Sequence, residues 1–188
     1  SLVSTKYSMM MLDSILRDAK KQLSSALIHK KHSFRYFTFT TLSLDGGPHS
    51  RTVVLRGFDP EKLTFSIYTD SRSEKIKELN KDSRAEFLFY DRKQLLQLAV
   101  KVNLIDIIPS EEKFYNLPDS SKKDYCVIQT PGTPIKGPEG VYYDFDKGYL
   151  IELNFEAVQL EYLKLKRPNH IRAKFNINQN WEGVFITP

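Results

Sequence analysis

Cysteine is almost absent from this chain, since Cys126 is the only one among 188 residues. A single cysteine excludes an intrachain disulfide and is typical of proteins from reducing compartments. Four histidines and one cysteine, at no ligand-like spacing, argue against a metal site. No apolar run reaches the length of a bilayer span, and the N-terminal segment carries charges throughout, unlike a signal peptide. We therefore expect a cytoplasmic or nuclear protein that does not associate with membranes.

The composition is that of an ordinary globular protein. Hydrophobic residues make up 40% of the chain and charged residues 27%, which excludes a disordered protein and provides for a core. The sequence has no internal repeats, so we expect a single domain over residues 1–188. The net charge of +5 is compatible with nucleic-acid binding. Because the basic residues are dispersed and mixed with acids, however, a phosphorylated small molecule is the better expectation, with no nucleic-acid partner.

Hydrophobic periodicity predicts mostly strands. Residues 7–30 have helical spacing, residues 73–80 form a short helix, and residues 117–149 are a long, loop-like insertion. Period-2 or apolar patterns between turn signals predict eight strands, at residues 36–44, 50–58, 63–69, 85–91, 95–108, 150–165, 170–177 and 181–187. Hairpin-length turns join most of them, which favours an antiparallel, closed or nearly closed barrel. The predicted fold class is α+β, mainly β, with flanking short helices.

One predicted strand ends in a polar turn that opens a helix. Thr69, Ser71 and Ser73 supply hydroxyl groups there, and Arg72 and Lys75 supply positive charge. The N-terminus of a helix also offers free backbone N–H groups and the positive end of the helix dipole. The turn is therefore a candidate anion site.

The strand of residues 50–58 carries a cation near each end. Alternation places Arg51 on one face, with Val53 and Leu55, and Arg56 on the other. A tight turn at Asp59–Pro60 predicts that this strand pairs with the next one, which would bring Arg51 level with the residues after Tyr68. An arginine fork beside the polar turn would complete a phosphate site. The alternative is that both arginines are surface residues.

Four signatures in this order resemble the FMN-binding split barrels of the pyridoxamine 5'-phosphate oxidase type. They are R-x-V-x-L-R at 51–56, Y-T at 68–69, S-x-K at 73–75, and a glutamine, Gln97, on the long strand. A fifth similarity is H-x-R at 170–172, followed by W-x-x-x-x-x-x-P at 181–188. Each motif is weak alone, but the ordered set is specific.

The resemblance implies an antiparallel split barrel that binds FMN between the subunits of a homodimer. Arg51, Ser73 and Lys75 would bind the FMN phosphate, and Arg172 would come from the other subunit. The remaining implied cofactor contacts are Thr52, Val53, Val54, Leu55, Arg56, Tyr68, Thr69 and Gln97. The substrate would be held by Arg56 and His170. No catalytic residue follows from the resemblance.

The chain also departs from this family. Glu74 stands where the oxidases have an arginine, although Arg72 could substitute for it. Leu163 stands at the place of a tryptophan near the flavin, and Pro168 at the place of another arginine. The Gln-Ser pair of the family's insertion has only a loose counterpart in Gln129–Thr130. These losses affect vitamin B6 phosphate oxidation more than FMN binding.

Three functions follow from these observations. The first is an FMN-dependent oxidoreductase acting on a small molecule, with pyridoxamine or pyridoxine 5'-phosphate as one candidate substrate. The second is a protein that holds FMN or another phosphorylated ligand without turnover, in which His170 is only a barrel-rim residue. The third is a basic nucleic-acid-binding barrel, which is disfavoured because the aromatic residues fall on both faces of their strands.

Overall fold

The computed structural model describes all residues, 1–188. Its elements are α1 (Leu2–Ile28), β1 (Tyr36–Leu42), β2 (Pro48–Val54), β3 (Gly57–Asp59), β4 (Thr64–Asp70), α2 (Glu74–Lys81), β5 (Arg84–Asp91), β6 (Leu96–Pro109), α3 (Glu111–Tyr115), α4 (Asp119–Lys122), the 3₁₀ turn η1 (Pro138–Gly140), β7 (Leu150–Lys164), β8 (Ile171–Asn176), the 3₁₀ turn η2 (Ile177–Gln179) and β9 (Gly183–Phe185). None of the helices is both long and apolar enough to cross a membrane.

The nine strands form one antiparallel sheet that curves around a core. The main strand order is β2-β1-β5-β6-β7-β4-β3, and β8 and β9 extend the sheet from β7. The two ends of the main path, β2 and β3, follow each other directly in the chain. Leu55 donates its N–H to Arg35, before β1, whereas Arg56 donates its N–H to Ser66 of β4. The sheet is therefore not closed by hydrogen bonds, and the chain itself crosses the opening.

This crossing corrects two expectations. The predicted strand 50–58 is divided, and only its last part, β3, pairs with β4. Arg51 lies opposite Phe39 of β1, so it is not paired with the end of β4 as the Asp59–Pro60 turn predicted. The reason is that the β1–β2 hairpin at Asp45–Pro48 supplies the first partner, and the chain changes partner at Leu55. The barrel is consequently split rather than closed.

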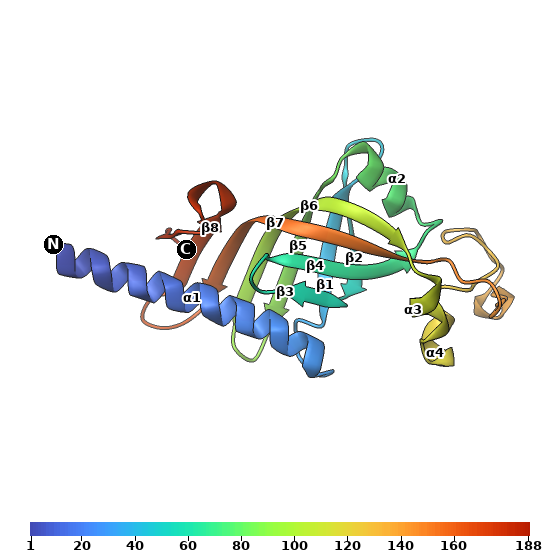
Figure 1. Cartoon of the computed structure of the whole chain (residues 1–188), viewed down its shortest axis with the longest axis horizontal. Coiled ribbons are helices and arrows are strands. Elements are labelled where there is room, and N and C mark those ends of the chain that lie inside the picture. Colours follow the sequence, from blue (N-terminus) through green and yellow to red (C-terminus); the bar gives the residue numbers. More distant parts are fainter.

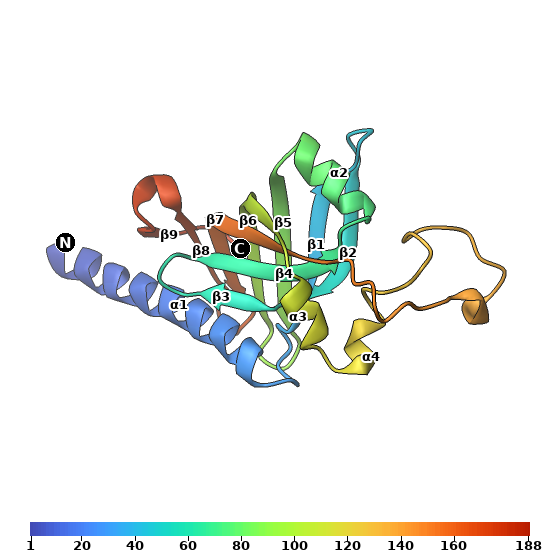
Figure 2. The ribbon, with the colours of Figure 1, turned by 45° about the vertical axis from the view of Figure 1, so that its right-hand side comes forward.

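Aromatic side chains fill the interior of the sheet. The buried cluster includes Phe39, Phe65, Phe87, Phe89 and Phe155, which contact one another mostly edge to face. Helix α1 covers one side of the sheet, and its N-terminal end projects beyond the barrel (Figure 1). The helix buries a stripe with helical spacing, Leu12, Ile15, Ala19, Leu23 and Ala26. Helix α2 and the insertion lie toward the other end of the sheet (Figure 2).

Candidate functional site

A cavity of about 320 Å³ lies where the ends of β2 and β4, the start of α2 and the insertion meet. Nine of its lining residues were predicted from the sequence: Arg51, Thr52, Val53, Val54, Arg56, Tyr68, Thr69, Ser73 and Lys75. Four were not: Asp70, Asp124, Tyr125 and Pro131. Residues from β2, β4 and α2 therefore converge as the signatures implied, although by a different strand pairing.

A larger groove, of about 650 Å³, lies on the outer face of β1, β5 and β6. Its charged side chains, Arg84, Glu86 and Lys101, are all exposed. No buried cation lines it. The smaller cavity is the better candidate site because its donors are partly or fully withdrawn from water.

The polar turn after β4 forms one end of the cavity. The ammonium group of Lys75 donates to Thr69 Oγ1 at 2.8 Å and to Ser73 Oγ at 3.2 Å. Thr69 and Ser73 are buried, and Ser73 makes no side-chain capping bond to α2. Three side-chain donors and the first N–H groups of α2 therefore lie together, an arrangement suited to an oxyanion.

The pKa of Lys75 is lower than that of an ordinary lysine. Burial, followed by the positive charge of Arg51, lowers the pKa of Lys75 to about 8. Asp70 and Glu78 act in the opposite direction but do not cancel these effects. Two neighbouring cations without an anion between them account for part of this shift. An anion bound in the cavity would relieve their repulsion.

Arg51 forms a second part of this end of the cavity. Its guanidinium donates to Thr41 Oγ1 at 2.6 Å and lies 3.1 Å from Glu78 Oε2. It also lies over the ring of Phe39, 5.2 Å from the centroid. Arg51 is therefore no freely moving surface arginine, and the surface interpretation does not apply to it.

The rest of the predicted strand only partly faces the cavity. Leu55 is buried in the core and does not line it. The N–H groups of Leu55 and Arg56 are already hydrogen-bonded to the carbonyls of Arg35 and Ser66. The Arg56 guanidinium lies 5.4 Å from the centroid of the Tyr68 ring, and its buried Nε has no partner. Arg56 is thus a lining residue with an unused donor.

Gln97, Leu163 and Arg172 lie in a row across β6, β7 and β8, away from this cavity. The Arg172 side chain pairs with Glu161 and donates to the carbonyl of Thr187 at 3.1 Å. His170, predicted to begin a strand, instead lies exposed in the turn before β8, where its Nδ1 accepts from the N–H of Lys166 at 3.0 Å. One chain therefore does not bring Gln97, His170 or Arg172 to the cavity.

Arg72 does not substitute for the missing phosphate arginine. Its side chain forms an ion pair with Asp70 at 2.7 Å and lies 3.5 Å from the centroid of the Tyr149 ring. It also donates to the carbonyls of Val127 and Ile128, at 2.7 and 3.1 Å. Arg72 thus attaches the insertion to the polar turn, which explains why Asp124 and Tyr125 reach the cavity. Gln129 is likewise engaged within the insertion, since it donates to the carbonyl of Gly140.

The residues missed by the sequence signatures fall into three groups: insertion residues that line the cavity, the Glu78 carboxylate, and its partners Thr41 and His49. Asp124 and Tyr125 reach the cavity through an irregular loop that no periodicity describes. Thr41 and His49 lie opposite each other in the β1–β2 hairpin, which the Asp45–Pro48 turn signal could have indicated. Glu78 had no such signal, because a glutamate on a short helix is normally exposed.

Comparisons with known proteins identify the family of this chain. The sequence model of the family described as "Pyridoxamine 5'-phosphate oxidase, FMN-binding domain" matches residues 16–105 of this chain. These residues include every predicted site residue except His170 and Arg172. The chain is 30% identical over 153 residues to pyridoxine/pyridoxamine 5'-phosphate oxidase 2 of Arabidopsis thaliana, covering 73% of this chain and 77% of that protein.

Two solved structures share the fold. A pyridoxamine 5'-phosphate oxidase-related, FMN-binding protein of Nostoc punctiforme has a TM-score of 0.73 at 22% identity, over 92% of this chain and 97% of that one. PhzG of Burkholderia lata, solved with tetrahydrophenazine-1-carboxylic acid, has a TM-score of 0.70 at 17% identity, over 90% of both chains. The split-barrel fold, the domain match and the Arabidopsis relative together place this chain in the pyridoxamine 5'-phosphate oxidase-like family of FMN-binding proteins.

Proposed function

We propose that this protein binds FMN with its phosphate at the Arg51–Lys75 end of the cavity. The observation that carries the proposal is the convergence of Arg51, Thr69, Ser73 and Lys75 at the N-terminus of α2. Two cations, two hydroxyl groups and free backbone N–H groups match the charge and acceptor oxygens of a phosphate. The lowered pKa of Lys75 marks the same place as one where an anion is favoured.

We further propose that the protein with FMN bound is an oxidoreductase. FMN supplies hydride chemistry, and the protein supplies binding, orientation and exclusion of water. Thr52, Val54 and Tyr68 would line the ring-bearing part of the cavity, and Arg56, which also lines it, would supply positive charge for an acidic substrate group. A vitamin B6 phosphate is one candidate substrate, because the Arabidopsis relative is named for acting on pyridoxine and pyridoxamine 5'-phosphates.

A non-catalytic FMN-binding protein is the second candidate. It is favoured because the chain has few candidate substrate-binding residues near the cavity. His170 lies in an exposed turn outside the cavity, and Leu163 stands at the place of an aromatic residue. Turnover of pyridoxamine and pyridoxine 5'-phosphates, measured as hydrogen peroxide release, separates the two candidates. A protein that binds FMN stoichiometrically and oxidises neither compound nor any other small donor would support the second.

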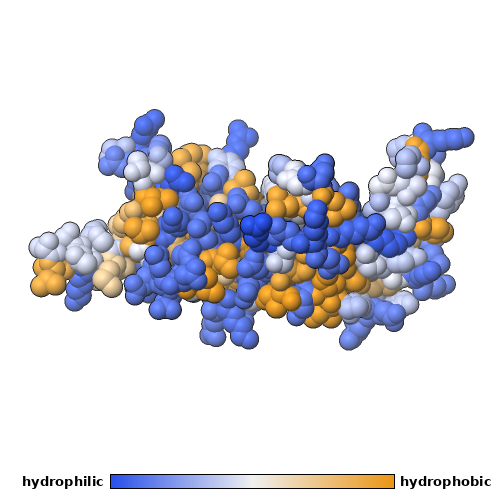
Figure 3. Space-filling view, turned by 90° about the horizontal axis from the view of Figure 1, so that it is seen from above, coloured by the Kyte–Doolittle hydropathy of each residue, from blue (hydrophilic) through white to orange (hydrophobic).

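The proposed site is completed in a homodimer. Gln97 and Arg172 share the outer face of the sheet with exposed apolar side chains, among them Leu88 and Tyr90 on β5. Apolar patches interrupt the charged surface, including the projecting end of α1 (Figure 3). We propose that this outer face packs against a second copy and carries Gln97 and Arg172 to the partner's cavity.

The first test is the visible absorption spectrum of the purified protein, followed by identification of any released chromophore. We expect flavin bands and FMN in near-stoichiometric amount, or binding of added FMN with micromolar or tighter affinity. A colourless protein that also fails to bind added FMN would overturn the proposed function while leaving the fold assignment intact.

A further inference from the structure

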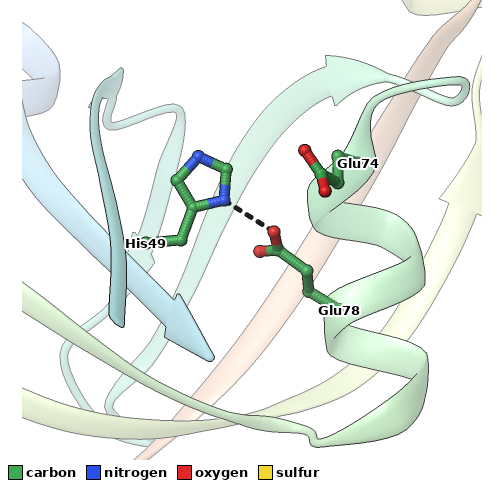
Figure 4. Close-up of side chains that lie close together, drawn as sticks. All are labelled: His49, Glu74 and Glu78. Carbon is green, nitrogen blue, oxygen red and sulfur yellow. Dashed lines mark hydrogen bonds and ion pairs between the residues drawn. The ribbon is translucent and has the colours of Figure 1, made fainter. Parts of the chain in front are cut away.

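A buried carboxylate, Glu78, forms an ion pair with one cation of the candidate phosphate site, Arg51, and shares helix α2 with the other, Lys75. Glu78 of α2 has no solvent exposure, although it belongs to a residue type that is rarely buried completely. Its Oε2 accepts from Thr41 at 2.5 Å and lies 3.1 Å from Arg51 Nη2, and its Oε1 lies 2.6 Å from His49 Nδ1. Figure 4 shows the His49 ring directed from β2 toward this carboxylate.

Glu78 remains an anion in this position. Burial raises the pKa of Glu78, but the hydrogen bonds from Thr41, His49 and Arg51 outweigh burial and hold it below its usual value. A buried charge is retained only where such partners compensate for its desolvation. The carboxylate therefore works as a fixed, charged anchor between β1, β2 and α2.

The anchor has consequences for both phosphate-binding cations. Thr41 and Glu78 restrain the Arg51 guanidinium, and Arg51 lines the cavity. Lys75 precedes Glu78 by about one turn of the same helix, so fixing Glu78 against β2 also fixes where Lys75 lies. We propose that Glu78 is a positioning residue for the FMN phosphate, acting by holding the Arg51 guanidinium and helix α2 in their binding arrangement. This inference rests on the proposed FMN function.

A metal ion is the competing explanation for the same cluster. His49, Glu74 and Glu78 place ligand atoms within 4.8 Å of one another. Both oxygens of Glu78 are already hydrogen-bonded, however, and the positive guanidinium of Arg51 is one of the partners. The contacts of Glu78 therefore favour the organisation of Arg51 over coordination of a cation.

The test compares FMN with riboflavin, which lacks the phosphate, by fluorescence titration of wild type and Glu78→Gln. We expect FMN to bind on the order of tenfold more weakly to the variant, with riboflavin affinity unchanged, because only phosphate recognition is misaligned. Glu74→Gln is the matched control, since it removes an equal charge one turn earlier from an exposed side chain without hydrogen bonds.

The opposite result has a clear meaning. If Glu78 contributed only negative charge, its removal would strengthen FMN binding, as would Glu74→Gln, and the positioning role would be wrong. Equal losses for FMN and riboflavin would also overturn it, because they would indicate general disruption of the cavity.

Two further measurements keep the inference testable if Glu78→Gln does not fold. Thr41→Val removes the hydroxyl shared by Arg51 and Glu78 without changing charge, and we expect a smaller loss in the same direction. In an Arg51→Lys background, removal of that hydroxyl should cause no additional loss, whereas an undiminished loss contradicts action through Arg51. Wild type that binds no FMN is a different failure, because it overturns the proposed function itself.

Discussion

At the scale of single residues, the cavity contains a partly buried lysine, Lys75, and an arginine, Arg51, whose guanidinium is hydrogen-bonded to Glu78. Lys75 is partly desolvated and lies near Arg51, so its positive charge is less stable than that of an ordinary lysine until an anion binds. Glu78, which does not line the cavity, forms an ion pair with Arg51. The resulting site has its charges assembled before ligand binding, which reduces the reorganisation that a phosphate must induce.

FMN affinity should consequently depend on pH. The pKa of Lys75 is lowered to about 8, so the free protein carries this charge below pH 8 and loses it above. A bound phosphate favours charged Lys75, and binding above pH 8 therefore requires proton uptake. We expect the affinity to fall above pH 8 by up to about tenfold per pH unit, and below about pH 6 as the phosphate is protonated.

Fluorescence titrations between pH 5.5 and 9.5 measure this profile. Lys75→Arg keeps its charge throughout this range and should abolish the fall in FMN affinity above pH 8. A fall in affinity that persists in this variant would assign the titration to another group. Glu78→Gln should move the fall in affinity to lower pH, because Glu78 is one of the groups that favour charged Lys75.

The site residues differ in how far sequence alone identifies them. Thr69, Ser73 and Lys75 lie within seven residues, so a strand-to-helix turn brings them together almost by itself. Arg51 could be placed near them only through the signatures, since the pairing argument used the wrong neighbouring strand. Thr41 and His49 could have been paired through the hairpin turn signal, but their contacts with Glu78 and the complete burial of Glu78 depend on a distant segment that local patterning does not report.

At the scale of elements, the strand interrupted at Leu55 and the attached insertion shape the cavity. Both were only partly predictable. Periodicity continues across residues 50–58, so nothing local reports that β2 and β3 have different partners. The insertion was correctly predicted to be mostly irregular, but its place over the cavity follows from Arg72, whose contacts with Val127 and Tyr149 join segments that are distant in the chain.

Removing this attachment should loosen the insertion while leaving the barrel folded. Arg72→Ala eliminates the bonds to two insertion carbonyls and leaves the buried Asp70 without its partner. We expect local opening of residues 117–149 to become easier by about 1–3 kcal/mol. Hydrogen exchange should then be faster in the insertion, and limited proteolysis should occur there first.

Arg72→Lys is the informative companion, because an ammonium group cannot reproduce the planar guanidinium that stacks on Tyr149 and serves four acceptors. The rate of hydrogen exchange in residues 117–149 of this variant should lie between the rates of wild type and Arg72→Ala. Unchanged exchange in residues 117–149 for both variants would show that the insertion is held by its small core around Phe114 and Cys126 instead.

A hydrogen bond between Tyr162 and Asp18 joins helix α1 to strand β7. The Tyr162 hydroxyl of β7 donates to Asp18 Oδ2 at 2.7 Å, and burial together with this carboxylate raises the pKa of Tyr162. Tyr162→Phe should destabilise the protein by about 1.5–3 kcal/mol, because the lost bond has a charged acceptor. Urea unfolding checks this value, with Tyr142→Phe, at an exposed residue of the insertion, as a control expected to change little.

At the scale of the whole molecule, the two halves of the predicted site lie on different surfaces. The cavity contains Arg51 and Lys75, whereas Gln97 and Arg172 lie on the outer face of β6 and β8. A single chain therefore provides each half once, and a symmetric pair would provide two complete sites. A two-fold arrangement is the simplest one in which the same outer face serves both copies.

The outer face can be tested without touching the cavity. Leu88 is 37% exposed on β5, beside the row that contains Gln97, and it lines no part of the cavity. Leu88→Glu would bury a charge in the proposed interface, and we expect a monomer by sedimentation velocity together with at least tenfold weaker FMN binding. Leu44→Glu, in the β1–β2 turn, adds the same charge at a similarly exposed site and should leave both properties unchanged. Loss of dimer with full FMN affinity would mean that one chain holds the cofactor alone, and the proposed contributions of Gln97 and Arg172 would be wrong.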